Sequence, residues 1–207
     1  MNRMYGKSAA LLIMLCMILT VVPSSVSAMD APKQDLTESD IQFDDSSELV
    51  MYGDAERLSD GTIQLTDLDI WQSGSAWYSH QIKSKSGFKT TFSYWTGGGR
   101  NLAYGGADGI VLTFSPETGL GSHGEDLGFV KGAFGVELDS YHNAYDPEGK
   151  HIAILKDSTR NHLTYRTDAR VDDSEWHTLT VTYSEDLLTV YLDDNFALSY
   201  DEIDLPD

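Results

Sequence analysis

Apolar and polar residues from position 41 onward follow a pattern that is typical of short β-strands separated by turns. They alternate over 62–65 and again over 88–95, where aromatic residues stand at both ends. A period of two places successive side chains on opposite faces of an extended chain. Residues 110–114 form a continuous apolar run, which predicts a strand buried on both faces, and 134–139 alternates small or apolar residues with acidic ones. We therefore predict a strand over each of these four ranges.

The second half of the chain continues in the same way. Residues 151–155 form another apolar run, and 177–183 and 187–192 are rich in β-branched and aromatic residues. The intervening Ser184-Glu185-Asp186 predicts a tight hairpin. Helical periodicity is absent from the sequence beyond residue 28, and the 18 glycines are spread through the turns. This pattern predicts an all-β sandwich or jelly roll in one domain over 41–207.

The N-terminal segment differs from the rest of the chain. Arg3 and Lys7 precede an almost wholly apolar stretch over 9–22, and small residues follow at 26–28. This arrangement predicts a secretory signal peptide over 1–28. A membrane anchor is the alternative, although the apolar run is shorter than the roughly 20 residues that a span needs. We expect the mature protein to be secreted or held at the cell surface, with no membrane span after the signal is removed.

Cys16 is the only cysteine, and it lies within the apolar stretch. A lipid anchor there is a second alternative, but bulky residues at 13–15 precede the cysteine. Without Cys16 the chain has no thiol for a disulfide, a zinc site or a thiol enzyme. Residues 29–40 are polar and predict a flexible leader before the domain.

The chain is strongly acidic, with 33 Asp and Glu against 14 Lys and Arg and a net charge of −19. Affinity for nucleic acid comes mainly from Lys and Arg, so we expect no nucleic-acid partner. An acidic chain is compatible with divalent cations, which prefer oxygen ligands.

Residues 137–151 concentrate the polar groups that could bind metal. If the chain stays extended, Glu137, Asp139, Tyr141 and Asn143 project to the same side, and Asp146 follows in a turn. Calcium takes six to eight oxygens from carboxylates, amides and backbone carbonyls. The side chains of Asp139, Asn143 and Asp146, with a backbone carbonyl near Tyr141, could supply several of them.

A second ion that accepts oxygen and imidazole would suit another overlapping set. This set consists of Glu137, Asp139, Asp146 and His151, and its ligand types fit manganese or another transition metal. The alternative is structural: alternating acidic residues often mark a strand with one wet face, and a single histidine at a strand start is often exposed or structural. Spacing alone leaves both interpretations open.

The same segment resembles the metal-binding loop of the legume-lectin (L-type lectin) family, here of a bacterial type. The matching residues are 136–143, 146–147 and 151–154, which read VELDSYHN, DP and HIAI. Residues 74–78, 106–110 and 170–194 resemble other stretches of the family. The resemblance covers about 45–205 and implies a concanavalin A-like jelly-roll sandwich of antiparallel sheets. The final strands of that family have no counterpart before the chain ends at Asp207, so we expect a truncated sandwich.

The resemblance also implies residue roles. Glu137, Asp139, Asp146 and His151 would bind a transition metal such as manganese. Calcium would be bound by Asp139, Asn143, Asp146 and the backbone carbonyl of Tyr141.

Asp108 would accept hydrogen bonds from sugar hydroxyls after a cis peptide bond, together with Asn143, and the ring of Tyr141 would pack on the sugar. A backbone N–H of the 124–128 loop, around Gly124 and Glu125, would donate a further bond. Glu125 stands where the family usually has glycine, so its side chain is expected to narrow the pocket.

The predicted function is therefore non-catalytic, metal-dependent binding of glycans or glycoproteins. Two alternatives remain. One is a glycoside hydrolase on the same fold, whose strand motif begins like Glu137-Leu138-Asp139 but needs a second carboxylate nearby. The other is an adhesion domain that has lost sugar binding. The sequence names neither the sugar nor the oligomeric state.

Overall fold

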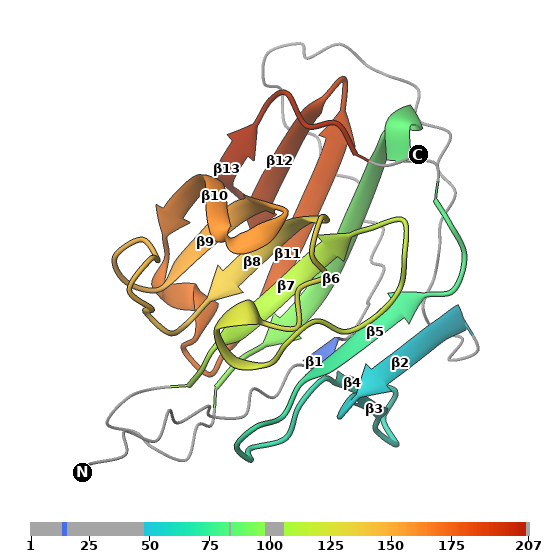
Figure 1. Cartoon of the computed structure of the whole chain (residues 1–207), viewed down its shortest axis with the longest axis vertical. Helices are drawn as coiled ribbons and strands as arrows, with labels where there is room; N and C mark the ends of the chain where they lie inside the picture. The colour runs from blue at the N-terminus through green and yellow to red at the C-terminus, as the bar shows by residue number, and fades with distance from the viewer. Residues whose placement is uncertain (1–13, 16–47, 83, 98–105, 206–207) are drawn as a thin grey trace.

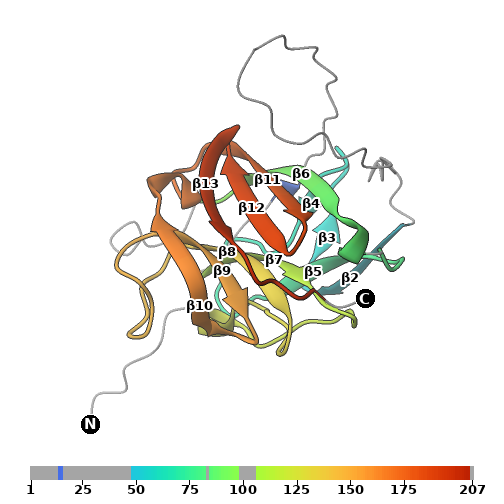
Figure 2. The ribbon, with the colours of Figure 1, turned by 90° about the horizontal axis from the view of Figure 1, so that it is seen from above.

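The protein is built mainly from two four-stranded antiparallel sheets that face each other as layers (Figure 1, Figure 2). The computed structural model describes residues 14–15, 48–82, 84–97 and 106–205. Sheet I has the strand order β10-β9-β8-β7, and sheet II has the order β13-β12-β11-β6. The strands of sheet I are β7 (Gly109–Phe114), β8 (Phe134–Asp139), β9 (His151–Lys156) and β10 (Ser158–Thr167). The strands of sheet II are β6 (Phe88–Trp95), β11 (Trp176–Ser184), β12 (Leu187–Leu192) and β13 (Asn195–Tyr200).

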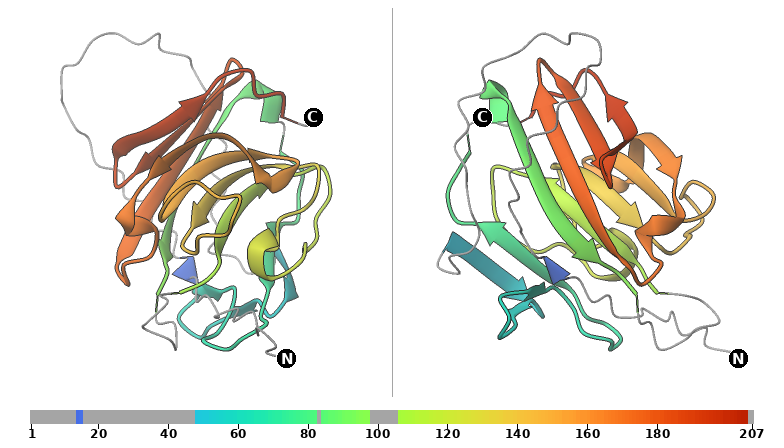
Figure 3. Two further views of the ribbon diagram at one scale, coloured as in Figure 1. Left: turned by 60° about the vertical axis from the view of Figure 1, so that its left-hand side comes forward. Right: turned by 180° about the vertical axis from the view of Figure 1, so that it is seen from behind.

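Two smaller sheets lie beside the β6 and β7 edges of the sandwich (Figure 3). One pairs β2 (Leu49–Gly53) with β5 (Gly74–Tyr78), and the other has the order β1-β4-β3. The latter strands are β1 (Met14–Leu15), β3 (Glu56–Arg57) and β4 (Ile63–Gln64). The helices of the described residues are the short 3-10 turns η2 (Ser84–Ser86), η3 (Gly124–Asp126) and η4 (Ala169–Val171). The described part of the chain contains no helix long and apolar enough to cross a membrane.

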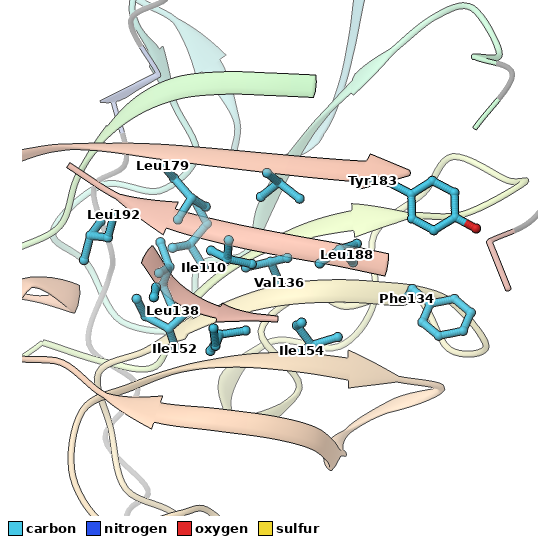
Figure 4. Close-up of a cluster of buried hydrophobic side chains, with 14 of the residues drawn as sticks. Ile110, Phe134, Val136, Leu138, Ile152, Ile154, Leu179, Tyr183, Leu188 and Leu192 are labelled. Carbon is cyan, nitrogen blue, oxygen red and sulfur yellow. The ribbon is translucent and has the colours of Figure 1, made fainter. Parts of the chain in front are cut away.

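The main core fills the space between the two sheets (Figure 4). Val136 and Leu138 of β8 and Ile152 and Ile154 of β9 point from sheet I toward Leu179 and its neighbours in sheet II. Each of these side chains is at most 1% exposed. Alternate residues of β8 and β9 therefore enter this core, and the residues between them point to the outer face of sheet I.

The outer face of sheet I is covered as well. Phe129 and Ala133 pack there against Ala153 and Leu155 of β9 in a second, smaller core. All six residues of β8 are consequently buried. This burial overturns the alternative of a strand with one wet face, because the segment around 129–133 shields the side that carries the acidic residues.

The alternating pattern predicted most strands closely. The bounds of β6, β8 and β12 agree with the prediction, and β9 begins at His151 as expected. Glu185 and Asp186 form the predicted tight connection, since Ser184 pairs with Leu187 and both loop residues have positive φ. Positive φ at both positions is typical of the type I′ hairpin turn.

Three expectations need correction or extension. Residues 110–114 are not buried on both faces: β7 lies at the edge of sheet I, and Ile110 is the buried residue of that run. In the two large sheets β10 and β13 were not predicted, since their sequences are largely polar or lack regular alternation. The short strands β2 and β3 beside the sandwich were not predicted either. The signal peptide and leader fall outside the described residues, apart from Met14–Leu15, and stay predictions.

His177 on β11 links several charged groups at one end of the sandwich. Its ring nitrogens lie 2.9 Å from Asp193 Oδ2 and 3.0 Å from Asp173 Oδ1. Arg170 also donates a hydrogen bond to Asp193. Burial alone would lower the pKa of His177, but its hydrogen bonds to Asp173 and Asp193 outweigh burial and raise that pKa above 6.5.

We expect this network to make stability depend on pH. A histidine whose pKa is raised on folding stabilises the fold fully below its unfolded pKa, and the gain is lost as pH rises through the folded pKa. Wild type should therefore unfold at a higher temperature than His177→Gln below pH 6.5, and this difference should shrink as the pH rises above that value. Thermal unfolding in buffers on both sides of that pH measures the difference, with exposed His80→Gln as control. A difference that is flat with pH would contradict a charged role for His177.

Candidate metal and ligand site

The candidate site is built at one end of β8 and β9, where polar residues share the outer face of sheet I. Glu137 pairs with Ala153, and Asp139 pairs with His151. Side chains directly opposite each other in an antiparallel pair lie on the same face. Glu137, Asp139 and His151 are 1%, 3% and 0% exposed. Buried carboxylates require a compensating cation or hydrogen bonds, so their charge needs an explanation.

Glu137 meets two histidines rather than one. Its Oε2 lies 3.5 Å from His151 Nε2 and 3.2 Å from His162 Nε2. The ligand atoms of these three side chains all lie within 4.8 Å of one another. Both Glu137 oxygens and both Nε2 atoms are buried without an aligned hydrogen-bond partner. An ion accepting oxygen and imidazole would satisfy all four atoms, so the donor set fits a transition metal.

The backbone fixes which nitrogen of His151 is available. His151 Nδ1 lies 3.1 Å from the carbonyl oxygen of Gly149, which can only accept a hydrogen bond. Nδ1 therefore carries the proton, and in the neutral ring Nε2 keeps its lone pair toward Glu137. Metal-binding histidines are commonly oriented through such a bond on the other nitrogen.

Asp139 lies close to the charges of this cluster. Burial, then the nearby Glu137 and Asp146, raise the pKa of Asp139 to about 8. Its Oδ1 accepts a hydrogen bond from the backbone N–H of Tyr141 at 2.8 Å. Such crowding of carboxylates is unfavourable unless a cation is bound between them.

The extended geometry predicted through Asn143 is wrong. β8 ends at Asp139, and Tyr141 and Asn143 lie in the loop of residues 140–150. Asn143 donates its backbone N–H to Asp146 Oδ2 at 2.6 Å, which folds the loop back on itself. Asp146 is brought near Asp139 by this turn rather than by strand alternation.

Asp108 lies beside the same loop. The peptide bond between Ala107 and Asp108 is cis. The carbonyl oxygen of Asp108 accepts hydrogen bonds from both the N–H and the Oγ of Ser140, each at 2.9 Å. Burial, followed by the charges of Glu125 and Asp146, raises the pKa of Asp108 to about 6. The main chain thus ties Asp108 to the end of β8, and its carboxylate lies within reach of the charges of Glu125 and Asp146.

The 122–128 loop forms the opposite side of the site. Gly124 and Glu125 open η3, and Leu127 ends it in a left-handed conformation. The Glu125 side chain forms an ion pair with Arg160 of β10, and Arg160 lies over the ring of Tyr145 at 4.6 Å. The Tyr145 hydroxyl donates to the Glu125 carbonyl at 3.3 Å. Glu125 is therefore held by Arg160, a partner that the sequence did not predict.

The structure brings the predicted residues together from three segments. Asp108, the 122–128 loop and the 140–150 loop meet around the outer end of β8. Tyr141 is 37% exposed, so the residue is accessible from solvent. His162 is the main addition to the predicted set. It lies on β10, whose polar sequence carried no pattern pointing to the site.

Comparison with known proteins identifies the family of this chain. Residues 40–205 match the family model of the legume lectin domain. The chain belongs to the legume lectin family. The fold is the concanavalin A-like jelly-roll sandwich that this family membership implies, and family membership supports carbohydrate binding.

Individual relatives show how far the likeness extends. A lectin of Onobrychis viciifolia is 30% identical over 121 residues, which is 55% of this chain and 49% of that lectin. The match thus spans about half the length of that relative. The winged bean acidic lectin complexed with methyl-α-D-galactose has a TM-score of 0.66 at 25% identity, covering 76% of this chain and 77% of the other. The Lotus tetragonolobus seed lectin also has a TM-score of 0.66 at 25% identity, with coverage of 77% and 80%.

Proposed function

We propose that this chain is a metal-dependent, non-catalytic carbohydrate-binding module of a secreted or cell-surface protein. The observation that carries the proposal is the position of Asp108. Its backbone is tied to Ser140 at the end of β8, and its carboxylate lies within reach of the charges of Glu125 in the 122–128 loop and Asp146 in the 140–150 loop. A half-buried acceptor beside an exposed tyrosine ring suits a sugar, which presents hydroxyl groups on its edge and an apolar face.

Each predicted residue has a role in this proposal. Asp108 and the Asn143 amide bind sugar hydroxyls, a backbone N–H at Gly124 or Glu125 donates to the sugar, and the Tyr141 ring packs against it. Asp139, Asn143, Asp146 and the Tyr141 carbonyl hold calcium. Glu137, Asp139, Asp146 and His151 hold manganese or another transition metal.

The ions would supply positive charge and fixed geometry. With metal bound, the crowded carboxylates of Asp139 and Asp146 are neutralised, and the 140–150 loop keeps one conformation. Preorganised polar groups bind more tightly because less conformational entropy is lost on binding. The chain's own residues then recognise the sugar.

A hydrolase is disfavoured by the burial of its candidate carboxylates. Glu137 and Asp139 are 1% and 3% exposed, so neither can reach a glycosidic bond. Retaining and inverting glycosidases both need two carboxyl groups that flank the scissile bond. The relatives named above are lectins, which agrees with a binding role.

The proposal is tested by a glycan array with the purified chain. We expect binding to a group of related glycans with calcium and manganese present, and a fall of at least about tenfold after EDTA, because loss of loop order weakens every contact. Re-addition of both ions should restore binding. Folded, metal-loaded protein that binds no glycan would overturn the proposal in favour of an adhesion domain without sugar binding.

A further inference from the structure

His162 is a buried polar side chain that the predicted metal set does not use. Its side chain is 9% exposed, and Nε2 lies 3.2 Å from Glu137 Oε2 without an aligned hydrogen bond. The His151 ring is near it, with ring centroids 5.4 Å apart in an edge-to-face arrangement. A buried nitrogen facing a buried carboxylate oxygen is costly unless a proton or an ion lies between them.

The strand register explains why His162 reaches the site. His162 pairs with Leu155 of β9, between two register irregularities of the β9–β10 ladder. Leu155 belongs to the outer face of sheet I, the face that also carries His151 and Glu137. β-bulges often redirect a side chain next to a functional site. β9 lies between β10 and β8 in the sheet (Figure 1), so His162 of β10 reaches Glu137 of β8 across β9.

The distances agree with ligation of one ion. Atoms that each lie roughly 2.1 Å from a common ion are themselves roughly 3.0–3.5 Å apart in tetrahedral or octahedral geometry. The two nitrogen-to-oxygen distances at Glu137, 3.5 and 3.2 Å, fall in this range. The same three side chains therefore need little movement to share an ion.

We propose that His162 is a direct ligand of the transition metal, which makes the site a two-imidazole site selective for Zn²⁺ or Co²⁺ over Mn²⁺. The inference rests on the proposed function, in which Glu137, Asp139, Asp146 and His151 hold that metal. Each imidazole that joins an oxygen-rich site favours zinc and cobalt more than manganese, which is the weaker binder in the divalent series and suits oxygen ligands.

The first test compares the Zn²⁺ and Mn²⁺ affinities of the purified chain, measured by competition with a chromophoric chelator. The protein carries no histidine tag, and calcium is present throughout. His162→Gln should lose at least about 100-fold in Zn²⁺ affinity, since replacing a residue that only hydrogen-bonds to a metal ligand already lowers metal affinity roughly 10–100-fold. Its Mn²⁺ affinity should fall by less than about tenfold, because manganese gains less from imidazole. His80→Gln, an exposed histidine, is the matched control and should match wild type. An unchanged ratio of zinc to manganese affinity in His162→Gln would overturn the inference.

The second test does not depend on a variant that folds. X-ray absorption of the Zn²⁺-loaded wild type should show two imidazole ligands, and a single imidazole would overturn the inference. Sugar binding is measured on the same sample. If the metal has one imidazole ligand and the protein binds sugar, the inference is wrong and the proposed function stands. If the metal has two imidazole ligands and the protein binds no sugar, the inference stands and the proposed function is wrong. A wild type that binds no transition metal overturns the inference and the transition-metal part of the proposed function.

Discussion

Asp108→Asn is expected to lose at least about 100-fold in glycan affinity while keeping the fold, because two charge-assisted hydrogen bonds at about 1.5–3 kcal/mol each are weakened. An asparagine keeps the size of the side chain but replaces one acceptor with a donor. The fold should be unaffected, since Ser140 bonds to the backbone carbonyl of residue 108 and not to its side chain. The measurement is a titration with the best glycan from the array, with calcium and manganese saturating.

The control for this variant is the same chemical change at an exposed carboxylate, Asp201→Asn. It changes the net charge equally and should bind glycan as wild type does. Unfolding temperature and metal content of Asp108→Asn are measured alongside, and both should stay close to wild type. Binding within about threefold of wild type would place the sugar site elsewhere, because one lost charged bond alone is worth more than that.

The strands that sequence predicted well are those whose side chains alternate between a main core and another environment. β8 is the clearest case: Val136 and Leu138 face the core between the sheets, and their neighbours are acidic or glycine. The sequence could not show that Glu137 is buried. Phe129 and Ala133 pack on the outer face of sheet I in one cluster with Ala153, the cross-strand neighbour of Glu137, and they carry no periodic pattern of their own.

The site residues that belong to one short sequence motif were predicted, and those that lie on a strand outside that motif were missed. Asp139, Asp146 and His151 lie within thirteen residues and fit a recognisable spacing. His162 and Arg160 lie on β10, whose pairing with β9 shifts register on both sides of His162, and His162 contacts Glu137 there. The partner of Glu125 was likewise unpredictable, because Arg160 meets it only through the three-dimensional packing of η3 on β10.

Metal binding should reverse the effect of one substitution on stability. In EDTA, wild type buries Glu137 and Asp139 close together, and burial with Glu137 and Asp146 raises the pKa of Asp139 to about 8. Asp139→Asn removes this repulsion and keeps an acceptor for the Tyr141 N–H. We expect a gain on the order of 2 kcal/mol, which corresponds to roughly 4–8 °C in unfolding temperature for a domain of this size.

With calcium and manganese present, wild type should be more stable than Asp139→Asn. Each ion at about a thousand times its dissociation constant stabilises the folded state by about 4 kcal/mol, or roughly 10 °C in unfolding temperature, and the two sites add. Asp139→Asn loses a ligand common to both proposed ions and should gain little from them. Thermal unfolding of both proteins with ions and with EDTA measures the four values.

Asp172→Asn is the control that shows what the loss of a buried carboxylate does when that carboxylate binds no metal. Asp172 is also buried, but it forms an ion pair with Lys150 at 3.0 Å. Its replacement leaves a cation without its partner and should lower the unfolding temperature both with ions and in EDTA. If Asp139→Asn behaves like Asp172→Asn and destabilises the protein in EDTA, the carboxylate at 139 supports the fold without metal. If Asp139→Asn is instead more stable than wild type in EDTA and gains no stability from the ions, the buried carboxylate at 139 destabilises the metal-free fold and is needed to bind the cation.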